Sequence, residues 1–591
     1  MAEIENTNFG KFSRINSFGY REQSYAFLNS WYFAAARIDE NFTTQINFYG
    51  GSQDDGLAYT GLPKSFVEDK ANRLKNFNYW EYENDGKTLG WTNPRRAREK
   101  EYFSQPSIEL LNDWQICPDL LFKSALFYKI GEGYFDYDGT GWTDAHSFRL
   151  NEENGYKNAD DPTNPIIRAY VQNKYAGWIP KVVWQHHDGE LVAGAEIRIH
   201  NSEHWGKINY AEKLPENFDP DFKFYSYFGG RDILSLFARE SYYLNENTTV
   251  SAEFQLVHHN YRIYDERDGI NFTEYYNKDG QIKTGEGDLF SINYLFLNPR
   301  LGINYNHTEN LNYYLSLAYT NREPRMNNLY RASDAFYGKT PAFSAKKIND
   351  STYFYDFSSP IVKPEKLIDI EFGATYRDEK NFLNINSYFM FYKDELVKSG
   401  ELDVFGSPID GNAPSTSHIG LELQGNNQLY KSNETQLNVS YNATYSINKI
   451  DELYYVGENM KLSLKDNNIA GFPSFMANVR LAYQYENFYI SALYKFVGEF
   501  YTDNFGDLLK TNQDLIMELG SEYYSDNINP SYSVINLDLS CKIDNIFTLN
   551  YLKLQAQVFN LTNEFYSAYA IGKEFFPASE RNFFIGIELG M

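Results

Sequence analysis

Apolar and polar residues alternate along most of this chain. In the segment LNYYLSLAYT, residues 311–320, every second position is leucine or tyrosine, and the segments 437–447, 535–543 and 552–558 repeat the pattern with other apolar residues. A period of two predicts half-buried β-strands with one apolar and one polar face. Because no segment shows a helical period of comparable strength, the alternation predicts an all-β protein.

The predicted strands are joined by two kinds of connection. Long connections of roughly 15 to 50 residues alternate without exception with short polar ones. Long loops are uncommon in compact soluble domains, and their strict alternation places all of them on one side of the sheet. We therefore predict a transmembrane antiparallel β-barrel with short periplasmic turns and long extracellular loops. The nine short connections are 38–41, 116–119, 186–189, 245–248, 307–310, 377–380, 431–434, 485–488 and 544–547.

The number of predicted strands is odd. Nine short turns join eighteen strands between about residue 25 and residue 563, and the segment 582–591 makes about 19. Bacterial single-chain barrels usually have an even number of strands. We therefore expect residues 1–24 to be the remnant of an earlier strand or loop, and residues 25–591 to form the barrel.

The composition agrees with a membrane barrel. Aromatic residues make up 18% of the chain, which excludes a disordered protein, and they gather near predicted strand ends such as 491–504, as interfacial girdles do. The sequence contains no run of 18 apolar residues, so it predicts no transmembrane helix. With 54 basic and 79 acidic residues the net charge is −25, which argues against nucleic acid as a partner.

The last segment, RNFFIGIELGM, is an apolar alternation. A soluble protein would leave such a strand as an exposed edge that invites aggregation. In a membrane barrel its apolar face would meet outer-membrane lipid, and its backbone edge would pair with the first strand of the same barrel. The alternating residues are Phe583, Ile585, Ile587, Leu589 and Met591.

No arrangement of catalytic residues stands out, so we expect the protein not to be an enzyme. The Gly-x-Ser-x-Gly, His-Glu-x-x-His and P-loop motifs are missing from the sequence. The only cysteines, Cys117 and Cys541, lack metal-site spacing. Residues 136–144 have the spacing of a calcium loop, but Ser147 stands where a bidentate glutamate is needed. We expect a turn-rich loop there, and no metal or cofactor.

A few loop residues are candidates for ligand binding. Arg322 and Arg325 flank Glu323 at the mouth of a predicted long loop, where they could bind an anionic ligand, because arginine pairs with carboxylates through two hydrogen bonds. The alternative is a structural ion pair with Glu323 or with carboxylates of the lumen. Three aromatic residues on loops could stack on sugars or flat ligands, or pack the loops together: Trp142, Tyr330 and Tyr501.

Several motifs along the chain resemble the TonB-dependent outer-membrane receptors, particularly the type common in Bacteroidota. The segment VFNLTNEFY, residues 558–566, followed by PASERNFFIGIELGM, is similar to the C-terminal signature of that family. FLNPRLGINY (296–305), YTNREPRMNNLY (319–330) and VKPEKLIDIEFGATY (362–376) resemble successive barrel segments. The resemblance runs from about residue 19 to the end of the chain.

The resemblance implies a 22-strand barrel around an N-terminal plug. The nineteen predicted strands would then be the family's fourth to twenty-second, and the plug, the TonB-interacting box and about three strands would be absent from this sequence. The implied function is TonB-dependent uptake of a scarce nutrient, such as siderophore-bound iron, cobalamin or a glycan, across a Gram-negative outer membrane. The implied partners are the barrel-assembly machinery, which would recognise the last segment, and the TonB complex, through a plug not present in this chain.

Two alternative functions remain open on the sequence alone. An ungated pore or structural barrel would conduct ions steadily in liposomes. A secreted carbohydrate-binding β protein, built as a propeller or sandwich, would be missing from outer-membrane fractions.

Overall fold

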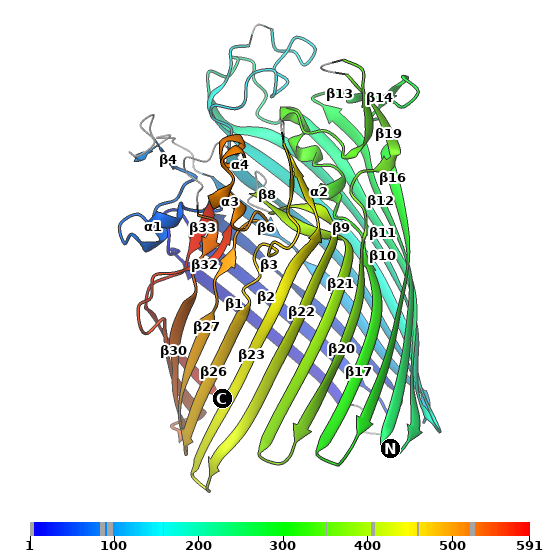
Figure 1. The fold of residues 1–591 in the computed structure, drawn as a ribbon, viewed down its shortest axis with the longest axis vertical. Coiled ribbons are helices and arrows are strands. Elements are labelled where there is room, and N and C mark those ends of the chain that lie inside the picture. Colours follow the sequence, from blue (N-terminus) through cyan, green and yellow to red (C-terminus); the bar gives the residue numbers. More distant parts are fainter. Residues whose placement is uncertain are drawn as a thin grey trace.

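The computed structural model describes residues 5–82, 89–91, 99–157, 159–349, 352–402, 408–457, 460–519 and 526–590. In this part of the chain a 22-stranded sheet curls into a barrel (Figure 1). Its strands are β1 (Glu5–Ser17), β2 (Ala26–Ile38), β3 (Phe42–Gly56), β6 (Lys100–Ser104), β7 (Ser107–Cys117), β8 (Leu120–Asp138), β9 (Thr163–His186), β10 (Gly189–Glu212), β11 (Tyr225–Asn245), β12 (Thr248–Asp268), β13 (Asn271–Phe272), β16 (Asp288–Asn306), β17 (Leu311–Arg322), β20 (Glu365–Arg377), β21 (Asn381–Leu402), β22 (Pro408–Lys431), β23 (Thr435–Glu452), β26 (Phe475–Tyr485), β27 (Phe488–Val497), β30 (Tyr532–Ile546), β31 (Leu549–Phe559) and β34 (Asn582–Gly590).

The remaining elements lie in the long loops, which gather at one end of the barrel (Figure 1). They are small hairpins and single helical turns. The strands are β4 (Trp80–Tyr82), β5 (Leu89–Trp91), β14 (Glu274–Asn277), β15 (Ile282–Thr284), β18 (Phe343–Lys347), β19 (Tyr353–Pro360), β24 (Tyr454–Val456), β25 (Lys461–Ser463), β28 (Phe500–Tyr501), β29 (Ile528–Asn529), β32 (Ser567–Ile571) and β33 (Glu574–Pro577), and the helices are α1 (Lys64–Glu68), α2 (Met326–Leu329), the 3₁₀ helix η1 (Ala332–Tyr337), α3 (Leu508–Thr511) and α4 (Gln513–Glu518).

The strand order confirms the predicted antiparallel barrel. All nine short connections join neighbouring antiparallel strands. β6 and β7 both pair with β3 and β8 and so act as one interrupted strand, and β13 is a two-residue extension beside β12. Among the described residues the 22 strands therefore reduce to twenty long ones.

The twentieth strand is β1, which the sequence pattern did not count. β1 pairs with β2 over 13 residues. Its register places Asn6, Asn8 and Arg14 on the same face as the apolar Phe33 of β2. Because Phe12 is the only large apolar residue among the outward positions of β1, this strand lacks the alternation that reveals the other strands. The predicted number of nineteen is therefore one too low, and residues 5–17 belong to the sheet.

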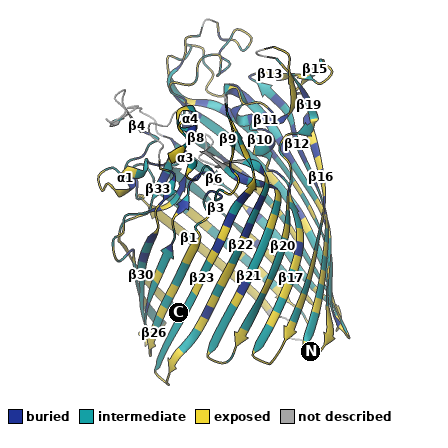
Figure 2. Ribbon diagram, in the orientation of Figure 1, coloured by how far each residue is buried: buried dark blue, intermediate teal, exposed yellow. Residues whose placement is uncertain are grey.

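The alternation in sequence becomes an apolar outside and a polar lumen. Exposed residues alternate with intermediate ones along many strands in Figure 2. On β17, Leu315 and Leu317 are 41% and 42% exposed on the outer face, where lipid would cover them. In the lumen, the buried Asn386 donates to Glu371 at 3.3 Å and to Glu422 at 3.2 Å. No helix in the described part of the chain is long and apolar enough to cross a bilayer.

The alternating apolar residues of the last strand face outwards, as the sequence predicts. β34 pairs with β31, and Phe583, Ile585, Ile587 and Leu589 are 53 to 80% exposed on its outer face. Met591, the fifth residue of the predicted assembly signal, lies outside the described residues.

The two edges of the sheet are not joined by strand pairing. The pairings run from β1 step by step to β34, and within the described ranges no register links β34 to β1. The two ends meet instead on the loop side, where Leu62 and Phe575 exchange backbone hydrogen bonds of 2.8 Å. The guanidinium of the fully buried Arg73 donates to the carbonyl of Ala578 at 2.7 Å. Loops after β3 and before β34 thus hold the sheet edges together.

Candidate functional site

The loop that follows β17 folds into the mouth of the barrel. Within this loop, η1 packs against β10 and β11, and α2 lies near β22. The ring of Phe336 in η1 lies 4.9 Å from that of Phe224 and 5.7 Å from that of Tyr225. These rings belong to a large buried aromatic cluster that covers one side of the mouth. The loop after β17 is therefore packed against the barrel wall and does not extend freely into solvent.

An anionic side chain anchors the start of this loop. Glu323 accepts hydrogen bonds from Arg231 of β11 and, at 3.1 Å, from Tyr261 of β12. The Nδ1 atom of His259 lies 3.5 Å from the same carboxylate. On the sequence alone, Glu323 is only a possible partner of the neighbouring arginines. Its actual partners are about 60 to 90 residues away, so no local pattern could have identified them.

The two candidate arginines have different surroundings. Arg322 forms a bidentate ion pair with Glu365, with nitrogen–oxygen distances of 2.7 and 2.8 Å. This is the pairing with a lumen carboxylate that the sequence left open as an alternative. Arg325 precedes α2, and its backbone N–H donates to the side chain of Asn328 at 2.9 Å. The Arg325 side chain is exposed at the mouth.

Tyr330 is part of the loop core. Its side chain is only 2% exposed, and its hydroxyl contacts Glu266 at 2.5 Å and the hydroxyl of Tyr275 at 2.7 Å. The pairing of β12 with β16 ends at Tyr264, and Glu266 lies two residues beyond it on the loop side. Glu266 also accepts a hydrogen bond from Thr273 at 2.8 Å. Burial raises the pKa of Glu266 to about 7. Tyr330 therefore joins the loop after β17 to the loop-side end of β12.

Trp142 and Tyr501 lie on different loop groups. Trp142 is 40% exposed at the edge of the aromatic cluster, and its ring is parallel to that of Tyr137 and 5.0 Å from that of Tyr337. Tyr501, in β28, donates to Asp507 at 3.1 Å. The structure thus brings Trp142, Tyr330 and the two arginines to one region, while Tyr501 belongs to the loops after β27.

A buried polar hub joins those other loops. Thr502 donates to the carbonyl of Gly572 at 2.6 Å, and Asn504 donates to the carbonyl of Lys398 at 2.8 Å. The amide of Asn527 donates to Asp503 at 2.8 Å. Asp503 is 1% exposed, and its burial raises the pKa of the carboxyl to about 6. Sequence gave no signal for this hub, because its residues come from three separate loops.

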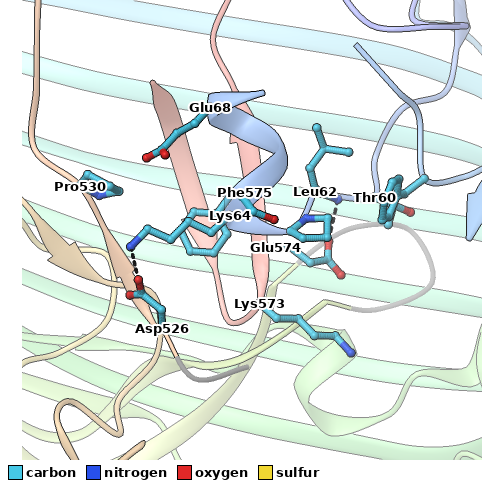
Figure 3. A pocket seen from close by; sticks show the side chains of 13 residues that line it. Thr60, Leu62, Lys64, Glu68, Asp526, Pro530, Lys573, Glu574 and Phe575 are labelled. Carbon is cyan, nitrogen blue, oxygen red and sulfur yellow. Dashed lines mark hydrogen bonds and ion pairs between the residues drawn. The ribbon is translucent and has the colours of Figure 1, made fainter. Parts of the chain in front are cut away.

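A hollow of about 810 Å³ lies between α1 and the β32–β33 hairpin (Figure 3). Lys64 bridges it to Asp526 with a distance of 2.6 Å, and Glu574 accepts from the backbone of Gly61 at 2.9 Å. The ring of Phe575 forms part of its wall. This volume suits a small organic molecule. Across the described ranges no group of three or more His, Cys, Asp or Glu is placed to hold a metal ion.

Comparison with a model of the "TonB dependent receptor-like, beta-barrel" family gives a match over residues 29–561. The chain belongs to this family. The match confirms the family resemblance read from the barrel motifs, which lie between residues 296 and 376. Receptors of this family reside in the outer membrane and work with TonB to import ligands. No curated protein matches the sequence.

Solved structures show the same fold. The ferric-catecholate import receptor Fiu from K12 E. coli in its closed form aligns over 99% of this chain and 78% of its own, with 12% identity and a TM-score of 0.66. The ferric citrate transporter FecA aligns over 98% and 72%, with 13% identity and a TM-score of 0.66. The RagAB peptide transporter aligns over 99% and 74%, with 11% identity and a TM-score of 0.62. The structural alignments establish a common fold. Sequence identities this low do not identify the ligand of this chain.

Proposed function

We propose that this chain is the barrel of an outer-membrane receptor that imports a scarce nutrient with energy from TonB. The main support is the loop cover, in which the segment after β17 is anchored inside the mouth through Glu323 and Tyr330. A packed loop cover over one side of the mouth, above a polar lumen, suits a receptor that captures a ligand better than an open diffusion pore, which needs a continuous aqueous path.

We propose that ligand contacts begin at the exposed residues of the cover. Trp142 presents a partly exposed ring and Arg325 an exposed cation near the same loop. Tyr501 would contribute from the opposite group of loops. Arg322 and Tyr330 would act by positioning the loop, because the first is paired with Glu365 and the second is buried.

We further propose that a plug and two additional strands are supplied by a segment outside this sequence. Both free edges carry unpaired backbone groups, which are costly in lipid. β1 runs away from the turn side and β34 runs towards it, so an inserted antiparallel element must have an even number of strands. On the outer face of β1, Asn6, Asn8 and Arg14 fit contact with protein better than contact with lipid, whereas Phe12 on the same face is 76% exposed.

Growth of a deletion strain tests the import function. The strain should be outgrown by its parent when one nutrient class is limiting, with iron, cobalamin and a glycan tested in parallel, and removal of TonB should abolish the difference. Equal growth under all three limitations would contradict the proposal. Steady conductance of the purified chain in liposomes, together with equal growth, would favour the ungated pore.

A further inference from the structure

A closed triangle of oxygen contacts lies at the loop-side end of β12. The hydroxyl of Tyr330 is 2.5 Å from Oε1 of Glu266, the hydroxyl of Tyr275 is 3.1 Å from Oε2, and the two hydroxyls are 2.7 Å apart. Glu266 and Tyr330 are each 2% exposed, so water has little access to these contacts. We call these three residues the Glu266 triangle.

The Glu266 triangle joins two long loops to the barrel wall. Glu266 belongs to β12, Tyr275 lies in β14 of the loop after β12, and Tyr330 lies in the loop after β17. The two loops also pair with each other, because β14 and β19 are neighbouring strands of one small sheet beyond the ends of β12 and β16 (Figure 1). Loss of the triangle would therefore release both loops from β12.

The three contacts of the triangle need three protons. A hydrogen bond between two oxygen atoms needs one proton between them, and each tyrosine hydroxyl has only one to donate. Thr273 does not supply the third proton, because its hydroxyl donates to Oε2 of Glu266 from outside the triangle, at 2.8 Å. The carboxyl of Glu266 must then carry it. In the closed triangle Glu266 donates to Tyr275, Tyr275 donates to Tyr330, and Tyr330 donates back to Glu266.

An ionised Glu266 would leave the triangle incomplete. With two protons for three contacts, one pair of oxygen atoms would face each other with lone pairs only, at 2.7 or 3.1 Å. A buried carboxylate is also costly unless it is paired with a cation. Among the described residues no ion pair joins a cation to Glu266, and its charged neighbour Asp268 repels a negative charge there. The surroundings therefore favour the protonated carboxyl.

The other acids near the triangle have partners of a different kind. Each pairs with an arginine, whereas Glu266 has hydroxyl partners only. Glu266 is therefore the acid whose proton decides whether its contacts are complete. The titratable and charged groups on the elements around the triangle are Asp268 of β12, paired with Arg149 at 2.9 Å, Asp334 of η1, paired with Arg331 at 3.6 Å, Tyr227 of β11, and Lys283 of β15, the cross-strand partner of Tyr275.

From this geometry we propose that a proton on Glu266 latches the loop cover, which is held firmly in mildly acidic medium and loosens in alkaline medium. The proton comes from the surrounding water and is released to it when the cover opens and Glu266 ionises. This inference rests on the loop cover of the proposed receptor and adds a means by which the outer medium controls it. It does not depend on which nutrient is imported.

The direction of the effect follows from the pKa of the buried carboxyl. Burial raises the pKa of Glu266 from 4.5 to about 7. Because the pKa is higher in the closed cover, the stability from the protonated form is complete below about pH 4.5 and is lost as the pH rises through about 7. With these two values the opening equilibrium of the cover should rise about tenfold between pH 6 and pH 8.

Hydrogen exchange of residues 326–343 against pH tests the latch, with the rates corrected for intrinsic exchange. In the purified full chain the corrected rate should rise about tenfold from pH 6 to pH 8. Glu266→Gln keeps a neutral group that can donate to Tyr275 and accept from Tyr330. Its corrected rate should be the same at both pH values, and at pH 8 at least about tenfold below that of wild type.

Glu274→Gln is the matched control, because it removes an exposed carboxylate from the neighbouring strand β14. This variant should keep the wild-type pH profile. His259, Asp268 and Asp334 are unchanged in both variants, so the difference between the profiles of wild type and Glu266→Gln reports Glu266 alone. A flat wild-type profile would overturn the proposal, as would a Glu266→Gln profile as steep as that of wild type.

Two further measurements keep the test decisive. The infrared difference spectrum between wild type and Glu266→Gln should show the band of a protonated carboxyl at pH 6, and its absence would overturn the proposal. Tyr275→Phe removes one oxygen atom from the triangle, so the corrected exchange rate at pH 6 should rise. An unchanged rate would count against the latch even if Glu266→Gln does not fold. Failure of the nutrient-growth experiment would leave all of these readouts unchanged, so the two proposals fail separately.

Discussion

Buried carboxylates hold the loops of this barrel, and each has a different set of partners. Glu323 is matched by a cation and a phenol, whereas Glu266 is held by neutral hydroxyl groups alone. Asp503 accepts from the amide of Asn527 and the backbone of Phe505, and its second oxygen has no hydrogen-bond partner. A buried charge without a counter-ion is expensive. The protonation state of Asp503 should therefore affect how firmly the hub is held.

Substitution of Asp503 should change the pH dependence of the hub. The folded pKa of about 6 lies above the ordinary carboxyl value, so the stability from the neutral form is full below about pH 4 and is lost as the pH rises through about 6. Asp503→Asn keeps this group neutral and offers an N–H to the unpartnered oxygen of Asn527. Hydrogen exchange of residues 499–511, corrected for intrinsic rates, should be equal to wild type at pH 4 and about tenfold slower at pH 7.5, which corresponds to about 1.4 kcal/mol.

The exposed Asp514 provides the control for this experiment. Asp514→Asn removes a carboxylate from the same loop and should leave the pH profile as in wild type. Faster exchange of the hub in Asp503→Asn at pH 7.5 would contradict the role given to the neutral carboxyl.

The hydroxyl of Tyr330 should be important for loop closure. Tyr330→Phe keeps the buried ring but removes contacts to Glu266 and Tyr275. Leaving buried polar groups with fewer partners costs about 1–3 kcal/mol. Thermolysin should cleave residues 323–343 of the variant faster than those of wild type. Tyr276→Phe, at a 42% exposed position of the neighbouring hairpin, should be cleaved at the wild-type rate, and equal rates for all three proteins would refute the prediction.

At the scale of elements, local sequence determines the strands but not their long-range partners. Alternation and short polar turns predicted nineteen strands and all nine hairpin turns, because both depend on neighbouring residues. β1 was missed because Phe12 is the only large apolar residue on its outward face. The Arg322–Glu365 pair and the anchor at Glu323 join residues 43 to 92 positions apart. Only the folded barrel brings such residues together.

The two faces of β34 should respond differently to a charge. Ile585 is 80% exposed on the outer face, while Phe584 pairs across from Gln557 on the lumen face. Arginine facing lipid costs about 2–4 kcal/mol near the bilayer centre. Ile585→Arg should lower the urea midpoint of the barrel in lipid vesicles well below that of Phe584→Arg. Equal midpoints would contradict the assigned faces.

At the scale of the whole molecule, the sheet is held at its seam by loops. Leu62, Arg73 and Phe575 join the two ends, while β1 and β34 keep free backbone edges. The sequence predicted nineteen strands, an odd number, and from it a missing segment, whereas the described residues form twenty long strands. It could not show the loop contacts, which depend on residues about 500 positions apart.

Disulfide trapping should show whether the seam is open. In a variant without Cys117 and Cys541, cysteines at residues 9 to 12, one at a time, are combined with Ile585→Cys. The purified chain should form no cross-link at any of these positions. The pair Gly10→Cys, Phe33→Cys, which are partners between β1 and β2, should cross-link as a positive control. A high yield between β1 and β34 would show direct closure and remove the need for further strands.

The location of the loops tests the account most directly. In the same cysteine-free background, Ser344→Cys is placed in an extracellular loop and Glu309→Cys in a short turn, both at exposed positions. An impermeant maleimide added to intact cells should label the first variant and leave the second unlabelled until the outer membrane is broken. Labelling of the short turn in intact cells, or recovery of both variants in a soluble fraction, would contradict an outer-membrane receptor with its ligand mouth facing outwards.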